Sequence, residues 1–241
     1  MAEKVVIGNA ELWHGDCLDV MRELPDNSVD MVVTDPPYFL PATHYSTRKA
    51  FKRRLADLGM LEHFFSDVFA EWHRVLKQDG CIYCFCDAQA YPVFYALAYP
   101  DYKRVAALVW DKGVAINGYS WRHQYELILI GERPEYPAIK TGDGDVLRDR
   151  AVGIDARVHP AEKPTAVLRK LIAKSNKPNG VVLDCFMGSC ATGEAALAEG
   201  ARFIGIEAER DYFDISVARL HANGAIPSAQ LCSENQEQLF A

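Results

Sequence analysis

Short, largely apolar runs that end on a carboxylate recur along this chain and alternate with segments of helical spacing. Runs of this kind are typical of strands buried on both faces. Their alternation with helices predicts an α/β fold, with a mainly parallel sheet and helices on both faces. Ligands bind such sheets at the carboxyl ends of the strands, so the closing acids are candidate site residues. These acids are Asp16, Asp35, Asp184 and Glu207.

The apolar spacing sets the expected elements. Strands are predicted at Leu12–Asp16, Val29–Thr34, Gly80–Asp87, Val105–Trp110, Tyr125–Ile130, Val181–Phe186 and Arg202–Glu207. Helices are predicted at Cys17–Leu24, Leu61–Leu76, Ala88–Ala98, Thr165–Ser175, Glu194–Glu199 and Arg210–Ala222. Lys77–Gly80 is expected to end the second helix as a turn, because a basic last turn followed by glycine is a common helix stop.

Composition limits the class of protein. The chain has 241 residues, 49% of them hydrophobic, which suffices for one full α/β domain with a small insertion. A net charge of -7 argues against unspecific coating of nucleic acid without excluding a local basic surface. Neither a signal peptide nor an apolar run of about 18 residues is present, so we expect a cytoplasmic protein without membrane contact.

The cysteines allow two interpretations. Seven irregularly spaced cysteines do not form a disulfide framework, so reduced thiols are expected. Cys81 and Cys84 have the spacing of a zinc knuckle, but in a strand positions three apart point to opposite faces, and no second pair completes a site. We therefore expect Cys81, Cys84 and Cys86 to be buried small hydrophobic residues, and no metal.

The tetrapeptide Asp35-Pro36-Pro37-Tyr38 follows one of the buried strands. The two prolines remove two backbone donors and stiffen the turn, leaving carbonyl groups free to accept hydrogen bonds from a ligand. A carboxylate, a free carbonyl and an aromatic ring are thus presented together. The alternative is an ordinary turn, since Asp-Pro often ends a strand and a following Tyr often only packs.

A second motif lies between Val181 and Glu207. Strand, glycine-containing turn, helix and strand form a βαβ unit whose closing acid, Glu207, is placed to accept hydrogen bonds from ribose hydroxyls. The turn, Gly188 to Gly193, lacks the Gly-x-Gly-x-x-Gly pattern of pyrophosphate binders. A nicotinamide dinucleotide is therefore not expected.

Asp16 also has a simpler interpretation, as the cap of the following helix.

Taken together, these motifs resemble the β class of amino-group DNA methyltransferases, whose catalytic motif precedes the cofactor motif. Asp35–Tyr38 resembles the catalytic motif, Asp184–Ser189 the Asp-Pro-Phe-x-Gly-Ser motif, and His159–Pro164 the His-Pro-x-x-Lys-Pro motif. Gly15-Asp16 matches the position that contacts the cofactor's adenine. The resemblance spans nearly the whole chain and implies a Rossmann-like class I methyltransferase fold with circularly permuted motifs.

The resemblance also implies a mechanism. Asp35 and the Pro36 carbonyl would accept hydrogen bonds from the exocyclic amino group of a flipped base, and Tyr38 would stack on it. S-adenosylmethionine would donate the methyl group. Its site residues would be Asp16, Lys163, Asp184, Phe186, Gly188, Ser189, Cys190 and Glu207, with Lys163 near the carboxylate end.

This chain departs from the family pattern at two positions. Cys190 stands where the family usually has glycine, and Cys185 stands where it usually has proline. A Cβ at position 190 costs about 1 kcal/mol if the backbone there needs a positive φ. Weakened cofactor binding is therefore an expectation to be tested against the structure.

The DNA contacts are expected in two loops. The segment 39–60 has five basic residues, Arg48, Lys49, Lys52, Arg53 and Arg54, against one acid. Phosphate is the natural partner of such a loop, and a solvated charged loop is the alternative. The loop 111–123 adds Trp121 and Arg122, and its glycines, aromatic residues, Asn and basic residues suit base stacking and hydrogen bonding, although long loops often have such a composition.

The expected organisation has four parts. Residues 1–132 form the catalytic half, 133–158 a small insertion that could recognise the target sequence, 159–224 the cofactor-binding half, and 225–241 a flexible tail. A homodimer is compatible with the apolar helices. Any endonuclease of a restriction-modification pair would be a separate chain.

The motifs favour a site-specific adenine-N6 methyltransferase acting on duplex DNA, because Asp at the first catalytic position is more often associated with adenine, and Ser with cytosine. Three alternatives stay open. One is a cytosine-N4 methyltransferase, and another is a DNA-binding or cofactor-binding relative with weakened catalysis, suggested by Cys190. The third is a protein side-chain amide methylase, which Asp35 and the basic loop disfavour.

Overall fold

Nine strands form one sheet, and the apolar runs of the sequence supply most of them. The computed structural model describes residues 2–37, 58–114, 120–139, 142–150 and 163–222. The strands are β1 (Glu3–Ile7), β2 (Ala10–His14), β3 (Val29–Thr34), β4 (Leu76–Cys86), β5 (Arg104–Asp111), β6 (Tyr125–Glu132), β7 (Val146–Arg148), β8 (Val181–Asp184) and β9 (Arg202–Glu207). The helices are α1 (Cys17–Glu23), α3 (Leu58–Val75), α4 (Tyr91–Ala98), α5 (Thr165–Ser175), α6 (Ala191–Ala198) and α7 (Arg210–Ala222).

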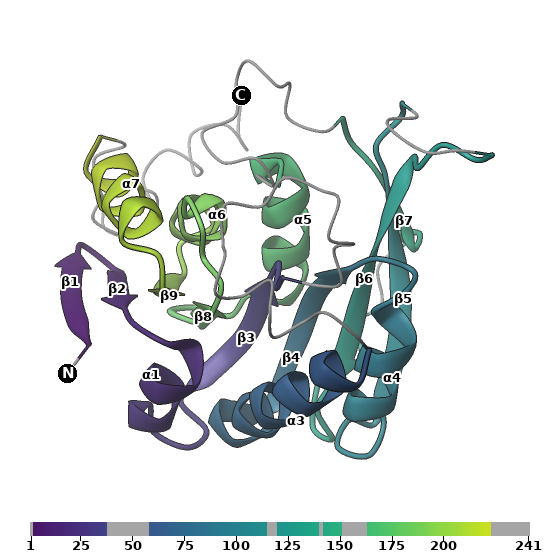
Figure 1. Cartoon of the computed structure of the whole chain (residues 1–241), viewed down its shortest axis with the longest axis horizontal. Coiled ribbons are helices and arrows are strands. Elements are labelled where there is room, and N and C mark those ends of the chain that lie inside the picture. The colour runs from purple at the N-terminus through teal and green to yellow at the C-terminus, as the bar shows by residue number, and fades with distance from the viewer. Residues whose placement is uncertain (1, 38–57, 115–119, 140–141, 151–162, 223–241) are drawn as a thin grey trace, which may run out of the picture.

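The strand order across the sheet is β1-β2-β9-β8-β3-β4-β6-β5-β7 (Figure 1). The five adjacent strands from β2 to β4 are parallel to one another. The β4–β6 and β6–β5 pairs are antiparallel, as is the β1–β2 hairpin at the opposite edge. The predicted fold class is confirmed, with antiparallel strands at both margins of a parallel centre.

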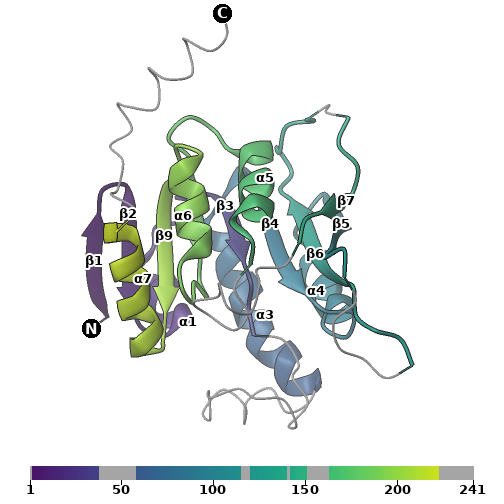
Figure 2. The ribbon, with the colours of Figure 1, turned by 90° about the horizontal axis from the view of Figure 1, so that it is seen from above.

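Helices cover both faces of the sheet. Figure 2 shows α5, α6 and α7 on one face and α1, α3 and α4 on the other. The apolar stripe of α5 is buried as its spacing predicts, with Val167 and Ile172 fully inaccessible. On the other face, Phe65 and Trp72 of α3 pack over the centre of the sheet. Because both faces are covered, the central strand β3 is buried at every residue, Asp30 included.

The thiols of β4 are buried as expected. Cys81 belongs to the core under α5, whereas Cys84 and Cys86 belong to the core under α3 and α4, so positions three apart do face opposite sides. Burial raises the pKa of each of these thiols, which keeps them protonated at neutral pH. They therefore behave as small apolar side chains.

The structure differs from the sequence predictions at several elements. The predicted turn at Lys77–Gly80 is wrong, because β4 begins at Leu76 and continues through it. The pairing of β4 with β3 shifts register between Val29 and Met31, and this irregularity accommodates the polar residues without ending the strand. β1 was not predicted, nor was β7, which pairs with β5 inside the segment predicted to be irregular.

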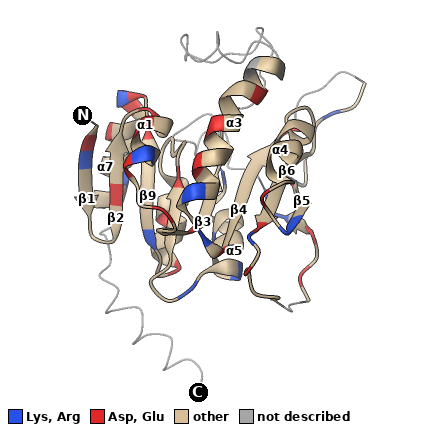
Figure 3. Ribbon diagram, turned by 90° about the horizontal axis from the view of Figure 1, so that it is seen from below, with Lys and Arg blue, Asp and Glu red and all other residues tan. Residues whose placement is uncertain are grey.

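Charge is mixed over the described part of the chain. Figure 3 shows Lys and Arg interspersed with Asp and Glu along the ribbon. Within the same residues, none of the helices combines the length and the apolar character that crossing a membrane requires.

Candidate active site

A pocket lies at the carboxyl ends of four neighbouring strands, as expected for an open α/β sheet. Its walls come from the residues after β2 (Gly15, Asp16, Cys17), after β3 (Pro37), after β8 (Cys185, Phe186) and at the end of β9 (Ile206, Glu207, Ala208, Glu209). Four predicted site residues, Asp16, Pro37, Phe186 and Glu207, thus line one pocket. The β2, β8 and β9 ends meet here because those strands are adjacent and parallel.

Glu207 is buried at the end of β9 and held by the backbone. Its Oε2 accepts from the Gly188 amide at 2.9 Å, and its Oε1 accepts from the Glu209 amide at 2.9 Å. Each carboxylate oxygen can accept more than one hydrogen bond. The loop after β8 and the turn after β9 together fix the orientation of this acid.

The loop Met187–Cys190 is held from behind by α7. Gly188 has φ 53°, a conformation that glycine adopts without steric cost. Ser216 donates to the Gly188 carbonyl at 2.7 Å, and Arg219 donates to the Ser189 carbonyl at 3.2 Å. Ser189 is therefore buried in a hydrogen-bonded loop and is not among the residues that line the pocket.

The backbone of Cys190 lies in the left-handed region, which fits the glycine that the family usually has at this position. Its φ is 65°, and it precedes α6 as the cap residue. The side chain is fully buried, and its Sγ lies so close to Gly193 that a Cβ there would be 2.4 Å away. Cys190 is not one of the pocket residues, so its thiol packs into the core beside α6 rather than into the pocket.

Asp184 ties the two halves of the site together. Its Oδ1 accepts from the Thr34 hydroxyl at 2.6 Å and from the Phe186 amide at 3.1 Å. Thr34 ends β3 and Asp184 ends β8, and these strands are neighbours. Burial raises the pKa of Asp184 to about 6. Asp184 lies behind the pocket wall, so any role toward the cofactor acts through Phe186.

Asp35 lies directly after β3, and Lys163 donates a hydrogen bond to its Oδ2. The other oxygen, Oδ1, is buried and has no hydrogen-bond partner among the described residues. Burial raises the pKa of Asp35, against the lowering effect of the Lys163 ammonium. Pro36 is buried beside it, and Pro37 reaches the pocket wall. An unsatisfied buried carboxylate oxygen next to a ligand pocket is a strong acceptor that awaits a donor.

Two residues of this site, Glu126 and Lys112, were not predicted from the sequence. Glu126 of β6 forms an ion pair with Lys163 at 3.3 Å and accepts a hydrogen bond from Lys112 at 2.5 Å. The sequence carried a signal for Glu126, because it is an acid beside the apolar run Leu127–Ile130, and such acids are rarely buried without a partner. The ammonium of Lys163, a residue predicted to hold the carboxylate end of the cofactor, contacts the two carboxylates and the face of Phe85.

The predicted DNA-binding residues are only partly described. Trp121 is 88% exposed and Arg122 is also exposed, close to the amino end of β6. Other predicted residues lie outside the described part of the chain: Tyr38, the basic residues Arg48, Lys49, Lys52, Arg53 and Arg54, and His159–Glu162 of the third motif.

The fold and the pocket define a class I methyltransferase. A DNA methylase family profile matches residues 29–218, most of the chain, and the chain therefore belongs to the N6/N4 DNA methylase family. Its substrate is DNA, and S-adenosylmethionine is the methyl donor of the family.

Individual relatives agree with this assignment. The chain is 35% identical to the methylase YubD of Escherichia coli over 86% of its length and 88% of that protein. It is 28% identical to the DNA adenine methyltransferase YhdJ of Escherichia coli, over 86% of this chain and 81% of the relative.

Solved structures share the fold. The cytosine-N4-specific PvuII DNA methyltransferase superposes with a TM-score of 0.73 at 17% identity, over 89% of this chain and 87% of that chain. M1.HpyAVI, solved as a complex with S-adenosylmethionine, superposes with a TM-score of 0.65 at 23% identity, over 88% and 98% of the two chains.

The residues of this pocket fit the cofactor of the family. An adenosine group needs an apolar wall, which Phe186, Ile206 and Pro37 provide, and an acceptor for ribose hydroxyls, which Glu207 provides. Asp16 remains exposed at the rim while its Oδ1 caps α1 by accepting from the Leu18 amide at 2.9 Å. The helix-cap interpretation of Asp16 is thus correct, and it places the carboxylate at the pocket.

Proposed function

We propose that this chain is a site-specific DNA adenine methyltransferase that modifies the exocyclic N6 amino group in duplex DNA after flipping the base. The observation that carries the proposal is the Oδ1 atom of Asp35, which is buried without a hydrogen-bond partner among the described residues and belongs to the same turn as Pro37 of the pocket wall. An exocyclic amino group is a donor with two hydrogens and matches this acceptor.

Asp35 and the Pro36 carbonyl activate the amino group by accepting hydrogen bonds from its two N–H groups. The nitrogen lone pair of adenine is delocalised into the ring and is a weak nucleophile. Two acceptors out of the ring plane favour a pyramidal nitrogen and return electron density to it. When bound, S-adenosylmethionine supplies an electrophilic methyl group on a sulfonium sulfur. Phe186, Ile206 and Glu207 hold the cofactor, and Tyr38 stacks on the flipped base.

Adenine is proposed over cytosine because the catalytic motif begins with Asp rather than Ser, and because the relative YhdJ is a DNA adenine methyltransferase. Retained cofactor binding is proposed because Cys190 directs its thiol toward Gly193 and is absent from the pocket lining. The weakened-catalysis alternative, which rested on Cys190, loses its main support.

The test is methylation of unmodified duplex DNA by the purified full chain with S-adenosylmethionine, followed by digestion and chromatography of the nucleosides. We expect N6-methyladenine. Asp35→Ala should lower the rate about 100-fold or more, since it removes an acceptor for the reacting group. Detection of N4-methylcytosine alone would overturn the adenine assignment.

Asp67→Ala is the matched control, because Asp67 is an exposed carboxylate on α3. It should methylate DNA at the wild-type rate. If the wild type binds S-adenosylmethionine in calorimetry but leaves both bases unmodified, the chain is a non-catalytic relative and the proposal fails.

A further inference from the structure

Asp35 and three other charged side chains form a largely buried cluster, and each of the four lies in or next to a different element. Asp35 follows β3, Lys112 follows β5, Glu126 belongs to β6, and Lys163 precedes α5. Their side chains are between 7% and 21% exposed. Two carboxylates and two ammonium groups cancel in formal charge, which satisfies the requirement that buried charges be paired.

The contacts run in one chain from Lys112 to Asp35. Lys112 donates to Glu126 Oε1 at 2.5 Å, Glu126 Oε2 lies 3.3 Å from the Lys163 ammonium, and Lys163 donates to Asp35 Oδ2. The Lys163 ammonium also lies over the Phe85 ring, 5.3 Å from its centroid. Lys163 is therefore shared by two carboxylates and enclosed by an aromatic face.

Because Lys163 is shared with Glu126, it bonds only one oxygen of Asp35. Lys163 occupies only Oδ2, while Oδ1 keeps no hydrogen-bond partner among the described residues. Glu126 draws the ammonium toward β6, and Lys112 fixes Glu126 by an ion pair on its other oxygen. Without Glu126, the ammonium could centre on Asp35 and occupy both of its oxygens, as Lys77 does with Asp30.

The groups that face Asp35 from the surrounding elements are few. They are Lys163, Glu126 and Lys112 in the cluster, Asp184 on β8, and the thiols Cys84 and Cys86 on β4. Burial keeps the two thiols neutral by raising their pKa. The pKa of Asp184 is set by its burial and by hydrogen bonds to Thr34, Thr192 and Phe186.

We propose that Glu126 and Lys112 are positioning residues of the methyl-transfer reaction. They hold Lys163 between two carboxylates, so that Oδ2 of Asp35 is anchored and Oδ1 is left for the amino group of the target base. The inference rests on the proposed role of Asp35 and adds to it the two residues that act on Asp35 through Lys163.

The two residues act on Asp35 with opposite sign, which makes the test sharp. Glu126 raises the pKa of Asp35 and Lys112 lowers it. Glu126→Gln removes a negative charge, so the pKa of Asp35 falls and the acid limb of the kcat profile moves to lower pH. Lys112→Gln removes a positive charge, so the acid limb moves to higher pH. The double variant should return the limb toward the wild-type position.

Three measurements are compared in the full-length protein: kcat on duplex DNA against pH, the dissociation constant of S-adenosylmethionine by calorimetry, and the carbon-13 NMR titration of the Asp35 carboxyl, assigned with Asp35→Ala. We expect kcat to fall by up to about 100-fold in Glu126→Gln, because a catalytic group is misplaced. The cofactor dissociation constant should stay within about twofold, because neither residue lines the pocket.

Shifts of the acid limb and of the Asp35 titration in the same direction in both variants, or no shift in either, would overturn the inference. If the wild type does not methylate DNA, the proposed function fails and the positioning role fails with it, while the NMR titration still decides whether Glu126 and Lys112 act on Asp35 through the cluster. If Glu126→Gln does not fold, Lys112→Gln still predicts an upward shift, and its absence is decisive.

Discussion

At the scale of single residues, Cys190 shows how a non-glycine side chain is accommodated in the left-handed region. A Cβ at φ 65° costs about 1 kcal/mol relative to glycine. Burial of the thiol in the core beside Gly193 and Phe203 offsets this cost, since free cysteine behaves as a small hydrophobic side chain. Gly193 is correspondingly restricted, because any side chain there would collide with the Cys190 sulfur.

This balance predicts an order of stability for two variants. Cys190→Ala loses the buried sulfur and keeps the strained Cβ, whereas Cys190→Gly loses both. Urea denaturation should find Cys190→Ala less stable than Cys190→Gly by about 1 kcal/mol. Calorimetry should find the wild-type affinity for S-adenosylmethionine in both. An alanine variant as stable as the glycine variant would show that position 190 is unstrained in solution.

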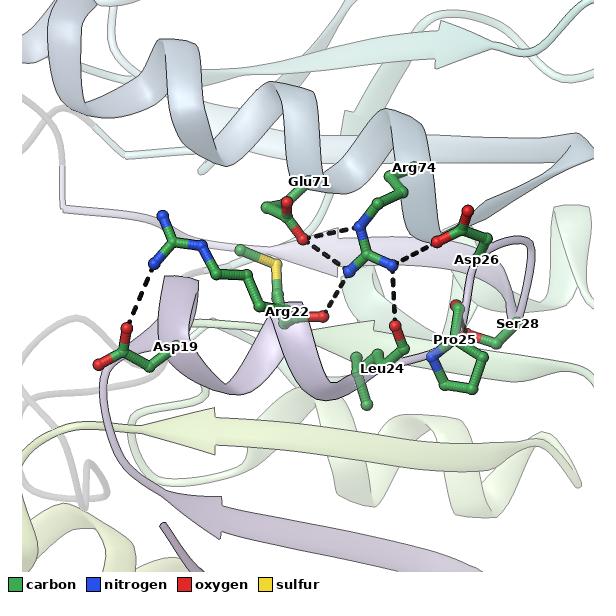
Figure 4. A network of polar contacts seen from close by, with 9 residues as sticks. Asp19, Arg22, Leu24, Pro25, Asp26, Ser28, Glu71 and Arg74 are labelled. Atoms are coloured by element: carbon green, nitrogen blue, oxygen red, sulfur yellow. Dashed lines mark hydrogen bonds and ion pairs between the residues drawn. The ribbon is translucent and has the colours of Figure 1, made fainter. Parts of the chain in front are cut away.

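At the scale of elements, Arg74 joins α3 to the end of α1. Its guanidinium donates to the Met21 carbonyl at 2.6 Å and to the Leu24 carbonyl at 2.8 Å, while Glu71 and Asp26 flank it (Figure 4). The Met21 carbonyl also accepts from the Leu24 amide at the end of α1, so Arg74 adds a second donor there and ties the cap residue Leu24 to α3. Because α1 begins beside Asp16, this contact also supports the pocket rim.

Replacement of Arg74 should separate geometry from charge. Arg74→Met removes every one of these hydrogen bonds and should lower the free energy of unfolding by about 1–3 kcal/mol. Arg74→Lys keeps the charge but lacks the planar fork, so it should recover only part of the loss. Urea denaturation measures both. A lysine variant as stable as the wild type would mean that the guanidinium geometry contributes nothing beyond its charge, and equal losses in both variants would mean that the charge alone contributes nothing.

At the scale of the whole molecule, charge is distributed unevenly along the sequence. The net charge is -7, yet five basic residues lie between Arg48 and Arg54, outside the described residues, and the described ribbon mixes both signs (Figure 3). We infer that this segment supplies the phosphate contacts, since a protein of this net charge needs a local basic surface to approach DNA.

The prediction concerns the salt dependence of DNA binding. Arg53→Gln with Arg54→Gln should weaken binding and lower the slope of log affinity against log salt by up to about 1.8, or about 0.9 for each lost phosphate contact. Lys170→Gln with Arg202→Gln changes the net charge equally at exposed positions, one of them at the amino end of β9, and should leave the slope unchanged. Equal effects of both pairs would assign binding to net charge alone.

Local sequence patterns were sufficient for elements whose apolar spacing is strong. The predicted bounds are correct for α5, α7, β3 and β9, and β8 ends at Asp184, before the predicted end at Phe186, because the apolar periodicity of each segment matches its own burial. Polar segments were harder. Lys77–Gly80 continues a strand because its neighbour β3 supplies the pairing, a contact that helix-stop residues alone do not reveal.

The sequence by itself determined the chemical groups of this protein: acids at strand ends, a stiff Asp-Pro-Pro turn, and Glu207 at the end of its βαβ unit. Only the tertiary structure decided which of these groups meet. It placed Asp184 against Thr34 behind the pocket, and Lys163 between Asp35 and Glu126. The physical reason is that a buried charge needs a polar partner, and these partners are distant in the sequence. Lys163 and Glu126 are 37 residues apart, and Asp184 and Thr34 are 150 residues apart.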